Sequence, residues 1–156
     1  MSIRLIQAQP ADAPLVADLV GELLREIMTA IGMKAFEFSQ VETEARARRW
    51  LVDGTYTVLL ASHDEQVAGL LTLSESRALY AEGVFGIIPE LYVRPAFRSR
   101  RVGATLLAEA TNLAHTKQWT RLEVTTPPLP QFDRTLAFYE RQGFTITGGR
   151  KMKLFL

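Results

Sequence analysis

The chain has 156 residues, of which 47% are hydrophobic and 22% charged, a size and composition typical of one globular domain with its own core. It contains no cysteine and only two histidines, His63 and His115, which excludes disulfides, thiolate metal sites and a cysteine nucleophile and leaves no expectation of a metal centre. The formal net charge of +1, from 18 basic and 17 acidic residues, gives no electrostatic argument for nucleic acid or a membrane as a partner.

The first residues, 1–5, lack the apolar core and cleavage signature of a signal peptide, so we expect a cytoplasmic protein. Residues 3–7 are predicted to form a strand, and a helix is predicted to begin at residues 10–12 because leucine and isoleucine recur at helical spacing as far as Ile27. Residues 28–38 are apolar but lose this period at Gly32. Ser39 and Glu42 are spaced as a capping box for a second helix, which we expect to end at Asp53-Gly54.

Strands dominate the middle of the chain and alternate irregularly with helices after it. Strands are predicted over residues 56–62, 67–74 and 85–93, with a turn at 63–66 in which His63 is interpreted as a surface residue, as is His115. A helix over 101–117, a strand over 122–125, an irregular loop over 126–130 and a helix over 132–142 follow. Residues 144–147 and 151–156 are expected to pair as a terminal hairpin across Gly148-Gly149. We expect one α/β domain over residues 1–156, with a mixed sheet.

The most informative segment is the turn between the strand over 85–93 and the helix over 101–117. It carries Arg98, Arg100, Arg101 and Gly103. A helix N-terminus presents unpaired backbone N–H groups and a partial positive charge, and glycine lets a ligand approach the backbone closely. The pattern therefore predicts a diphosphate site, although a solvated basic turn would have the same composition.

Pro89 interrupts the strand over 85–93. Because proline has no N–H to donate, it indicates a β-bulge or a strand edge. A bulge here would free backbone groups of residues 90–93 for the amides of an extended ligand. The alternative is an ordinary proline on an edge strand.

Two motifs resemble the GNAT superfamily of N-acetyltransferases. Residues 91–95 followed by 98–103 are similar to its acetyl-CoA motif, Gln/Arg-x-x-Gly-x-Gly/Ala after a strand, with Arg98 first, Gly103 last, and Arg101 where the first glycine is usual. Residues 136–144, LAFYERQGF, are similar to its closing helix, and the order of elements agrees from Ile3 to Leu156. One departure is Phe132, which stands where the family often has a cofactor-binding asparagine.

This resemblance implies a fold, a co-substrate and a reaction. The fold is a single-layer, mostly antiparallel mixed sheet with splayed central strands and helices on both faces. The reaction is transfer of an acetyl group from acetyl-CoA to a primary amine, without a metal. Homodimers are common in the family, but the sequence itself gives no sign of one. The expected acetyl-CoA-binding residues are Leu91, Tyr92, Val93, Arg98, Ser99, Arg100, Arg101, Val102, Gly103 and Ala104.

The catalytic residues are assigned partly by resemblance and partly by chemistry. Tyr139 occupies the position of the family's general acid, which protonates the leaving thiolate; alternatively it is only a core aromatic residue. Backbone N–H groups of residues 91–93 are candidate donors to the developing oxyanion. Glu90 is the candidate general base, with Glu123 as its competitor and a mechanism without a dedicated base as a third possibility.

The acceptor is the least defined part. The apolar residues 28–38 are expected either to border the acceptor site or to form a short helix over the core. A small-molecule amine is our first choice and a protein or peptide amine the second. A non-catalytic acyl-CoA-binding module is the rival from another class. A generic nucleotide-binding protein fits poorly, because the chain has neither Gly-x-x-x-x-Gly-Lys-Ser/Thr nor Gly-x-Gly-x-x-Gly.

Overall fold

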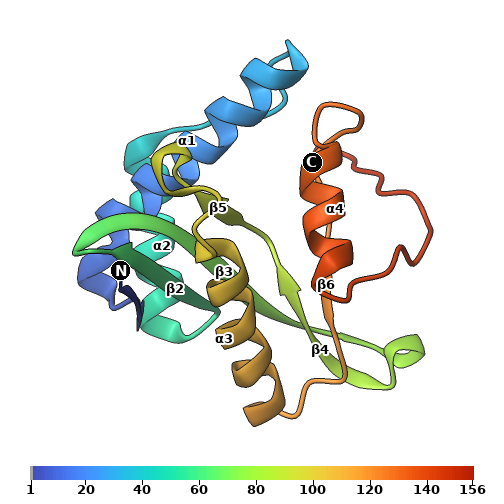
Figure 1. Ribbon diagram of the computed structural model, residues 1–156. Coiled ribbons are helices and arrows are strands. Elements are labelled where there is room, and N and C mark those ends of the chain that lie inside the picture. The colour runs from blue at the N-terminus through green and yellow to red at the C-terminus, as the bar shows by residue number, and fades with distance from the viewer. Residues whose placement is uncertain (1) are drawn as a thin grey trace. The chain divides into compact units, whose positions relative to one another are not determined.

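The computed structural model describes residues 2–156, which form two compact units, residues 2–125 and Thr126–Leu156. The first unit contains a sheet and the helices that cover it (Figure 1). Its elements are β1 (Ile3–Gln7), a 3-10 turn (Pro10–Asp12), α1 (Ala13–Ile31), α2 (Gln40–Asp53), β2 (Tyr56–His63), β3 (Gln66–Ala78), β4 (Gly83–Ile88), β5 (Leu91–Val93), α3 (Val102–Thr116) and β6 (Leu122–Val124).

The sheet has six strands within the described residues, in the order β1-β2-β3-β4-β6, and β5 pairs with β3 beside this path. Every pairing is antiparallel except that of β4 with β6, which is parallel. Because β3 is long, its first half pairs with β5 and its second half with β4. The mixed, mostly antiparallel sheet expected from the sequence is therefore confirmed.

The predicted interruption at Pro89 is a β-bulge between β4 and β5. Leu71 of β3 pairs with Leu91 and Ser74 pairs with Ile87, so the β4–β5 side carries one more residue than β3 over the same stretch. The extra residue divides the single strand expected over 85–93 into two. A proline can occupy this place because the ladder does not require its missing N–H.

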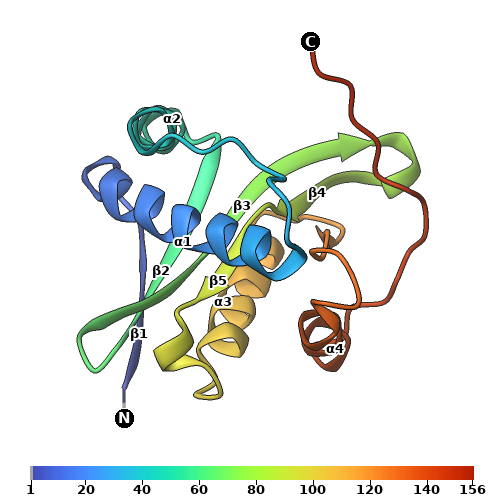
Figure 2. The same cartoon turned by 90° about the horizontal axis from the view of Figure 1, so that it is seen from above.

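The two faces of the sheet are covered by different helices (Figure 2). Val58, Leu60 and Leu70 belong to one core cluster with residues of α1 and α2. Successive side chains of a strand point to opposite faces, so the buried Leu59 and Leu71 lie on the other face, the one that α3 covers.

The ends of α1 and α2 follow from local signals in the sequence. Gly32 adopts a left-handed conformation (φ 69°) that ends α1, and its N–H donates to the Met28 carbonyl. Ser39 caps α2 by accepting a hydrogen bond from the Glu42 N–H at 3.2 Å. The predicted helix start at Ser39 and stop at Gly54 are confirmed.

The second unit consists of a loop, α4 (Asp133–Arg141) and a terminal segment. The terminal hairpin predicted over 144–147 and 151–156 is wrong, because residues 142–156 contain no strand and Ile146, Met152 and Leu154 are exposed. Gly148 and Gly149 do adopt the positive φ of a turn. A turn and alternating apolar residues do not suffice, since a strand needs a hydrogen-bonded partner and a core to bury its apolar side.

The two histidines differ in their surroundings. His115 is exposed, as expected. His63 is only 2% exposed, so its interpretation as a surface residue is wrong: it ends β2 and its ring lies against Phe97, with ring centroids 5.8 Å apart. The pattern around His63 indicated a turn, but the strand extends to include it.

Among residues 2–156, no helix is both long and apolar enough to cross a membrane.

Candidate active site

The turn that leads into α3 presents a row of unpaired backbone donors. Ser99 and Arg101 have positive φ (61° and 66°), and Arg101 is the N-cap residue of α3. Within residues 2–156, the N–H groups of residues 99–104 donate to no carbonyl or side chain. The next N–H along the chain, that of Thr105, donates to the Arg101 carbonyl. Such a concave row of N–H groups at a helix N-terminus suits an anion.

The arginines of this turn are arranged differently from one another. The Arg98 Nε donates to the Val93 carbonyl at 2.9 Å, and its Nη2 donates to the Glu26 carboxylate of α1 at 2.7 Å. Arg100 and Arg101 are exposed and form no ion pair with residues 2–156. The turn therefore offers two unpaired guanidinium groups and a third that is held against α1.

The strand before this turn has one free edge. The Arg94 N–H donates to the Ala68 carbonyl of β3 at 2.7 Å, so the backbones of Arg94 and Tyr92 face β3. Since backbone groups alternate along a strand, those of Leu91 and Val93 face the opposite edge, where no strand of residues 2–156 pairs with β5. This edge could receive the amides of an extended ligand.

An ion pair between α1 and the end of β5 supports this edge. The Arg94 Nε and Nη2 donate to the two carboxylate oxygens of Glu22 at 3.1 and 2.9 Å, and the Tyr92 hydroxyl donates to the same carboxylate at 3.2 Å. The hydrogen bond from Arg94 lowers the pKa of Glu22. Burial, and then the Glu22 charge, raises the pKa of Tyr92 to about 12. Glu22 is therefore an anion that fixes the strand and the turn to α1.

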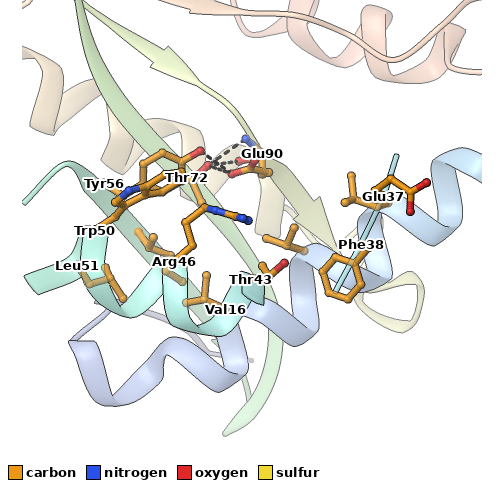
Figure 3. A pocket seen from close by; sticks show the side chains of 14 residues that line it. Val16, Glu37, Phe38, Thr43, Arg46, Trp50, Leu51, Tyr56, Thr72 and Glu90 are labelled. Atoms are coloured by element: carbon orange, nitrogen blue, oxygen red, sulfur yellow. Dashed lines mark hydrogen bonds between the residues drawn. The ribbon is translucent and has the colours of Figure 1, made fainter. Parts of the chain in front are cut away.

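A cavity of about 250 Å³ lies on the α1–α2 face of the sheet, and Glu90 of the bulge is in its wall (Figure 3). The Glu90 Oε1 accepts hydrogen bonds from the Thr72 hydroxyl at 2.6 Å and the Tyr56 hydroxyl at 3.3 Å. The Glu90 N–H donates to the Thr72 oxygen at 3.0 Å. Thr72 thus holds both the backbone and the carboxyl group of the bulge residue.

The second carboxyl oxygen of Glu90, Oε2, has no hydrogen-bond partner in residues 2–156. No buried side-chain nitrogen or oxygen of these residues lacks a partner, so Oε2 is accessible to solvent. Burial raises the pKa of Glu90, and the hydrogen bonds from Thr72 and Tyr56 oppose that rise. A half-buried carboxyl group with one free oxygen and a raised pKa is suited to accept a proton.

The rest of the cavity wall is mostly apolar. Its charged or polar residues besides Glu90 include Arg46 and Glu37, and the predicted border segment 28–38 contributes Glu37 and Phe38. Residues 32–39 contain no helix, so the short helix considered for this segment is not formed. The Phe38 ring lies directly over Gly21, where an added Cβ would come within 2.8 Å of it. The apolar lining comprises Val16, Val20, Leu24, Phe38, Ala47, Trp50, Leu51 and Val58.

The other two candidate catalytic residues lie elsewhere. Glu123 is on β6, pairs with Arg121 at 2.8 Å and does not line the cavity. Tyr139 belongs to the second unit, where it is buried edge-on against Phe138 and Phe144, with ring centroids 5.4 Å from each. Burial raises the pKa of Tyr139, so its hydroxyl stays protonated at neutral pH.

Sequence reasoning missed the groups that surround Glu90. Tyr56, Thr72 and Arg46 carry no motif, and they precede Glu90 by 18 residues or more in the sequence. One signal was available for Thr72: it is a hydroxyl residue within the otherwise apolar run 67–73.

Comparisons with known proteins agree with this architecture. Residues 54–146 match the acetyltransferase (GNAT) domain family, whereas no curated protein sequence matches the chain. A predicted acetyltransferase from Clostridium acetobutylicum, solved with acetyl-CoA, is 15% identical with a TM-score of 0.78, over 99% of this chain and 96% of that one.

Two further solved structures are named for their acceptors. The aminoglycoside acetyltransferase HMB0005, from an uncultured soil metagenomic sample, is 19% identical with a TM-score of 0.78 over 100% of both chains. A ribosomal-protein-alanine N-acetyltransferase from Brucella melitensis biovar Abortus 2308 is 18% identical with a TM-score of 0.73 over 99% of both chains. At these identities the likeness establishes the fold.

Proposed function

The chain belongs to the GNAT acetyltransferase family, and from this premise we propose that it is an N-acetyltransferase that moves the acetyl group of acetyl-CoA to a primary amine of a small molecule. The observation that carries the proposal is the position of Glu90. Its carboxyl group lines the cavity, and the next residue, Leu91, begins the strand with the free edge. An amine in the cavity and a thioester along that edge would meet beside one carboxyl group.

The residues around the turn and β5 fit acetyl-CoA. The unpaired N–H groups of residues 99–104, with Arg100 and Arg101, are suited to its diphosphate. The Leu91 carbonyl and the Val93 N–H could pair with the amides of its pantetheine arm as an added strand would, whereas the Val93 carbonyl is held by Arg98. The acetyl-CoA complex of the Clostridium acetobutylicum structure supports this choice. Acetyl-CoA supplies the acetyl group already activated as a thioester.

The proposed reaction assigns each proton to a residue of this chain. The amine must lose a proton as its lone pair forms the new N–C bond, and Glu90 Oε2 accepts that proton directly or through water. The N–H group of Leu91 donates to the carbonyl oxygen as it gains negative charge. As the C–S bond breaks, Tyr139 gives its proton to the thiolate. The products are the acetamide and free CoA, and the enzyme is restored when Glu90 releases its proton to solvent and Tyr139 regains one from solvent.

Glu90 is a better candidate for the base than Glu123. Glu123 is held in an ion pair by Arg121 and does not line the cavity. Glu90 has no cationic partner, and its environment favours the protonated form. We therefore assign the base to Glu90.

The size of the cavity favours a small acceptor. A cavity of about 150 Å³ holds one benzene molecule, so the volume of about 250 Å³ here corresponds to about ten non-hydrogen atoms on the same scale. This argues for a small amine over a protein segment. We propose that the reaction takes place in the cytoplasm and that residues 1–156 act as one catalytic domain.

The absence of cysteine allows a direct assay, because a thiol reagent then detects only the CoA that is released. The purified protein should release CoA from acetyl-CoA when small primary amines are added, and mass spectrometry should find the matching acetamides. Acetyl-CoA should also raise the Tm, with ATP and NAD as controls. Stabilisation by acetyl-CoA without transfer to any amine would instead indicate a non-catalytic acyl-CoA-binding module.

A further inference from the structure

We propose that the acceptor is a free amino acid with an apolar side chain, whose carboxylate binds Arg46 while its amine faces Glu90. This inference rests on the proposed function and names the substrate class of the same site. It follows from the charged side chains that line the cavity, from the apolar residues of its walls and from its volume.

Arg46 is the cationic group of the cavity. It lines the cavity from α2, its side chain points into the space in front of Glu90 (Figure 3), and it forms no ion pair or hydrogen bond with residues 2–156. Arg48, on the same helix, is paired with Glu44 at 3.7 Å and does not line the cavity. An unpaired guanidinium has parallel N–H donors that match a carboxylate.

The two acidic residues of the cavity have different roles. Glu37 pairs with Lys34 at 3.1 Å, and its side chain is 88% exposed, which places it at the rim. Glu90 is half-buried, lines the cavity and has its Oε2 unpaired. The cavity therefore offers one site for an amine at the half-buried Glu90 and one for an anion at Arg46, which lines the cavity and is exposed to solvent. A polycation such as an aminoglycoside would have to place further positive charges near Arg46, which is unfavourable.

The walls between these two groups are apolar. Val16, Val20 and Leu24 of α1 line the cavity together with Trp50 and Leu51 of α2. With room for about ten non-hydrogen atoms, the cavity suits leucine or methionine, and phenylalanine is slightly larger than this estimate. A charged or strongly polar side chain would lose its hydration against these walls.

The test compares each amino acid with the amine that lacks its carboxylate: phenylalanine with phenethylamine, and leucine with isopentylamine. For the wild type, kcat/KM should be higher for the amino acid by about tenfold or more, the scale of one hydrogen-bonded charge pair. In Arg46→Gln this ratio should fall towards one, mainly through a higher KM for the amino acid. Arg48→Gln, the matched control on the same helix, should keep the wild-type ratio.

Each other outcome has a defined meaning. Equal use of phenylalanine and phenethylamine by the wild type, or an unchanged ratio in Arg46→Gln, would overturn the inference and leave the N-acetyltransferase proposal intact. So would a preference for an aminoglycoside or a peptide N-terminus. If no amine of any class is acetylated, the proposed function fails, and the inference fails with it.

Discussion

At the scale of single residues, the proposed reaction depends on the surroundings of the Glu90 carboxyl group. A carboxyl group in an apolar wall pays a desolvation cost when it ionises, and this raises its pKa. The hydroxyls of Thr72 and Tyr56 reduce that cost through one oxygen and leave the other free. The fold thereby produces a base that is stronger than an ordinary surface glutamate.

The pH dependence of the reaction should reveal this base. In the wild type, kcat/KM should rise as the pH increases through the raised pKa of Glu90, because only the ionised form accepts a proton. Glu90→Gln should lower kcat/KM by about 100-fold or more and remove this limb of the profile. Glu123→Gln is the matched control and should leave both unchanged. If Glu123→Gln lowered kcat/KM while Glu90→Gln kept the wild-type value, the base would be Glu123 of β6.

The same pKa shift has a consequence for stability. A carboxyl group whose pKa is raised by folding stabilises the protein at pH values below its ordinary pKa, and that contribution is lost as the pH rises through the raised value. Glu90→Gln should therefore have a higher Tm than the wild type at neutral pH, and the two should converge in acid. A lower Tm at neutral pH would show that Glu90 is better stabilised as an anion than its surroundings suggest.

Tyr139 allows a second test at the residue scale. Its hydroxyl is expected to give a proton to the thiolate, and phenylalanine keeps the ring that contacts Phe138 and Phe144. Tyr139→Phe should lower kcat by about 100-fold while the Kd of acetyl-CoA, measured by calorimetry, stays the same. Normal turnover of this variant would reduce Tyr139 to an aromatic packing residue.

At the scale of elements, the position of β5 depends on the close approach of β3. Gly69 of β3 pairs with Val93, and a Cβ at Gly69 would collide with the Tyr92 carbonyl oxygen. Only glycine lets the two backbones approach to this degree, and the approach fixes the free edge of β5.

Gly69→Ala should therefore displace β5, lower the free energy of unfolding by about 1–3 kcal/mol and weaken acetyl-CoA binding. Gly21→Ala is the matched control, because its new Cβ would meet only the ends of the Phe38 and Arg25 side chains, which can move. That variant should keep the wild-type Kd for acetyl-CoA. Equal stability and affinity in Gly69→Ala and the wild type would show that β5 does not need this approach.

The elements also show what could be predicted from the sequence. Local signals sufficed for the helix boundaries at Ser39 and Gly54 and for the bulge at Pro89, because caps, glycines and prolines act on their own neighbourhood. Alternation alone failed for residues 144–156, which have the pattern of strands but no partner strand.

The surroundings of Glu90 could not be predicted in the same way. Tyr56 and Thr72 reach it only through the register of β2 on β3 and of β3 on the bulge. The sequence carries that register only indirectly, through which face of each strand is apolar. The identity of Glu90 as a candidate base was therefore predictable, whereas its partners and the role of Arg46 were not.

At the scale of the whole molecule, the charged side chains of this near-neutral protein are distributed unevenly. The net charge is +1, yet Arg98, Arg100 and Arg101 stand together at the turn before α3. Glu26 of α1 already holds one of these arginines, and the unpaired N–H groups of residues 99–104 adjoin them. Long-range attraction is therefore weak, and we expect a diphosphate to be bound by local contacts at this turn.

The most direct test of the account is amide hydrogen exchange, followed by NMR with and without saturating acetyl-CoA. With acetyl-CoA, exchange should slow by about tenfold or more at residues 99–104 and at Leu91 and Val93. ADP has the diphosphate but no pantetheine, so it should slow exchange at residues 99–104 but not at Leu91 or Val93. Unchanged exchange at all these amides, with protection elsewhere in the chain, would contradict the account.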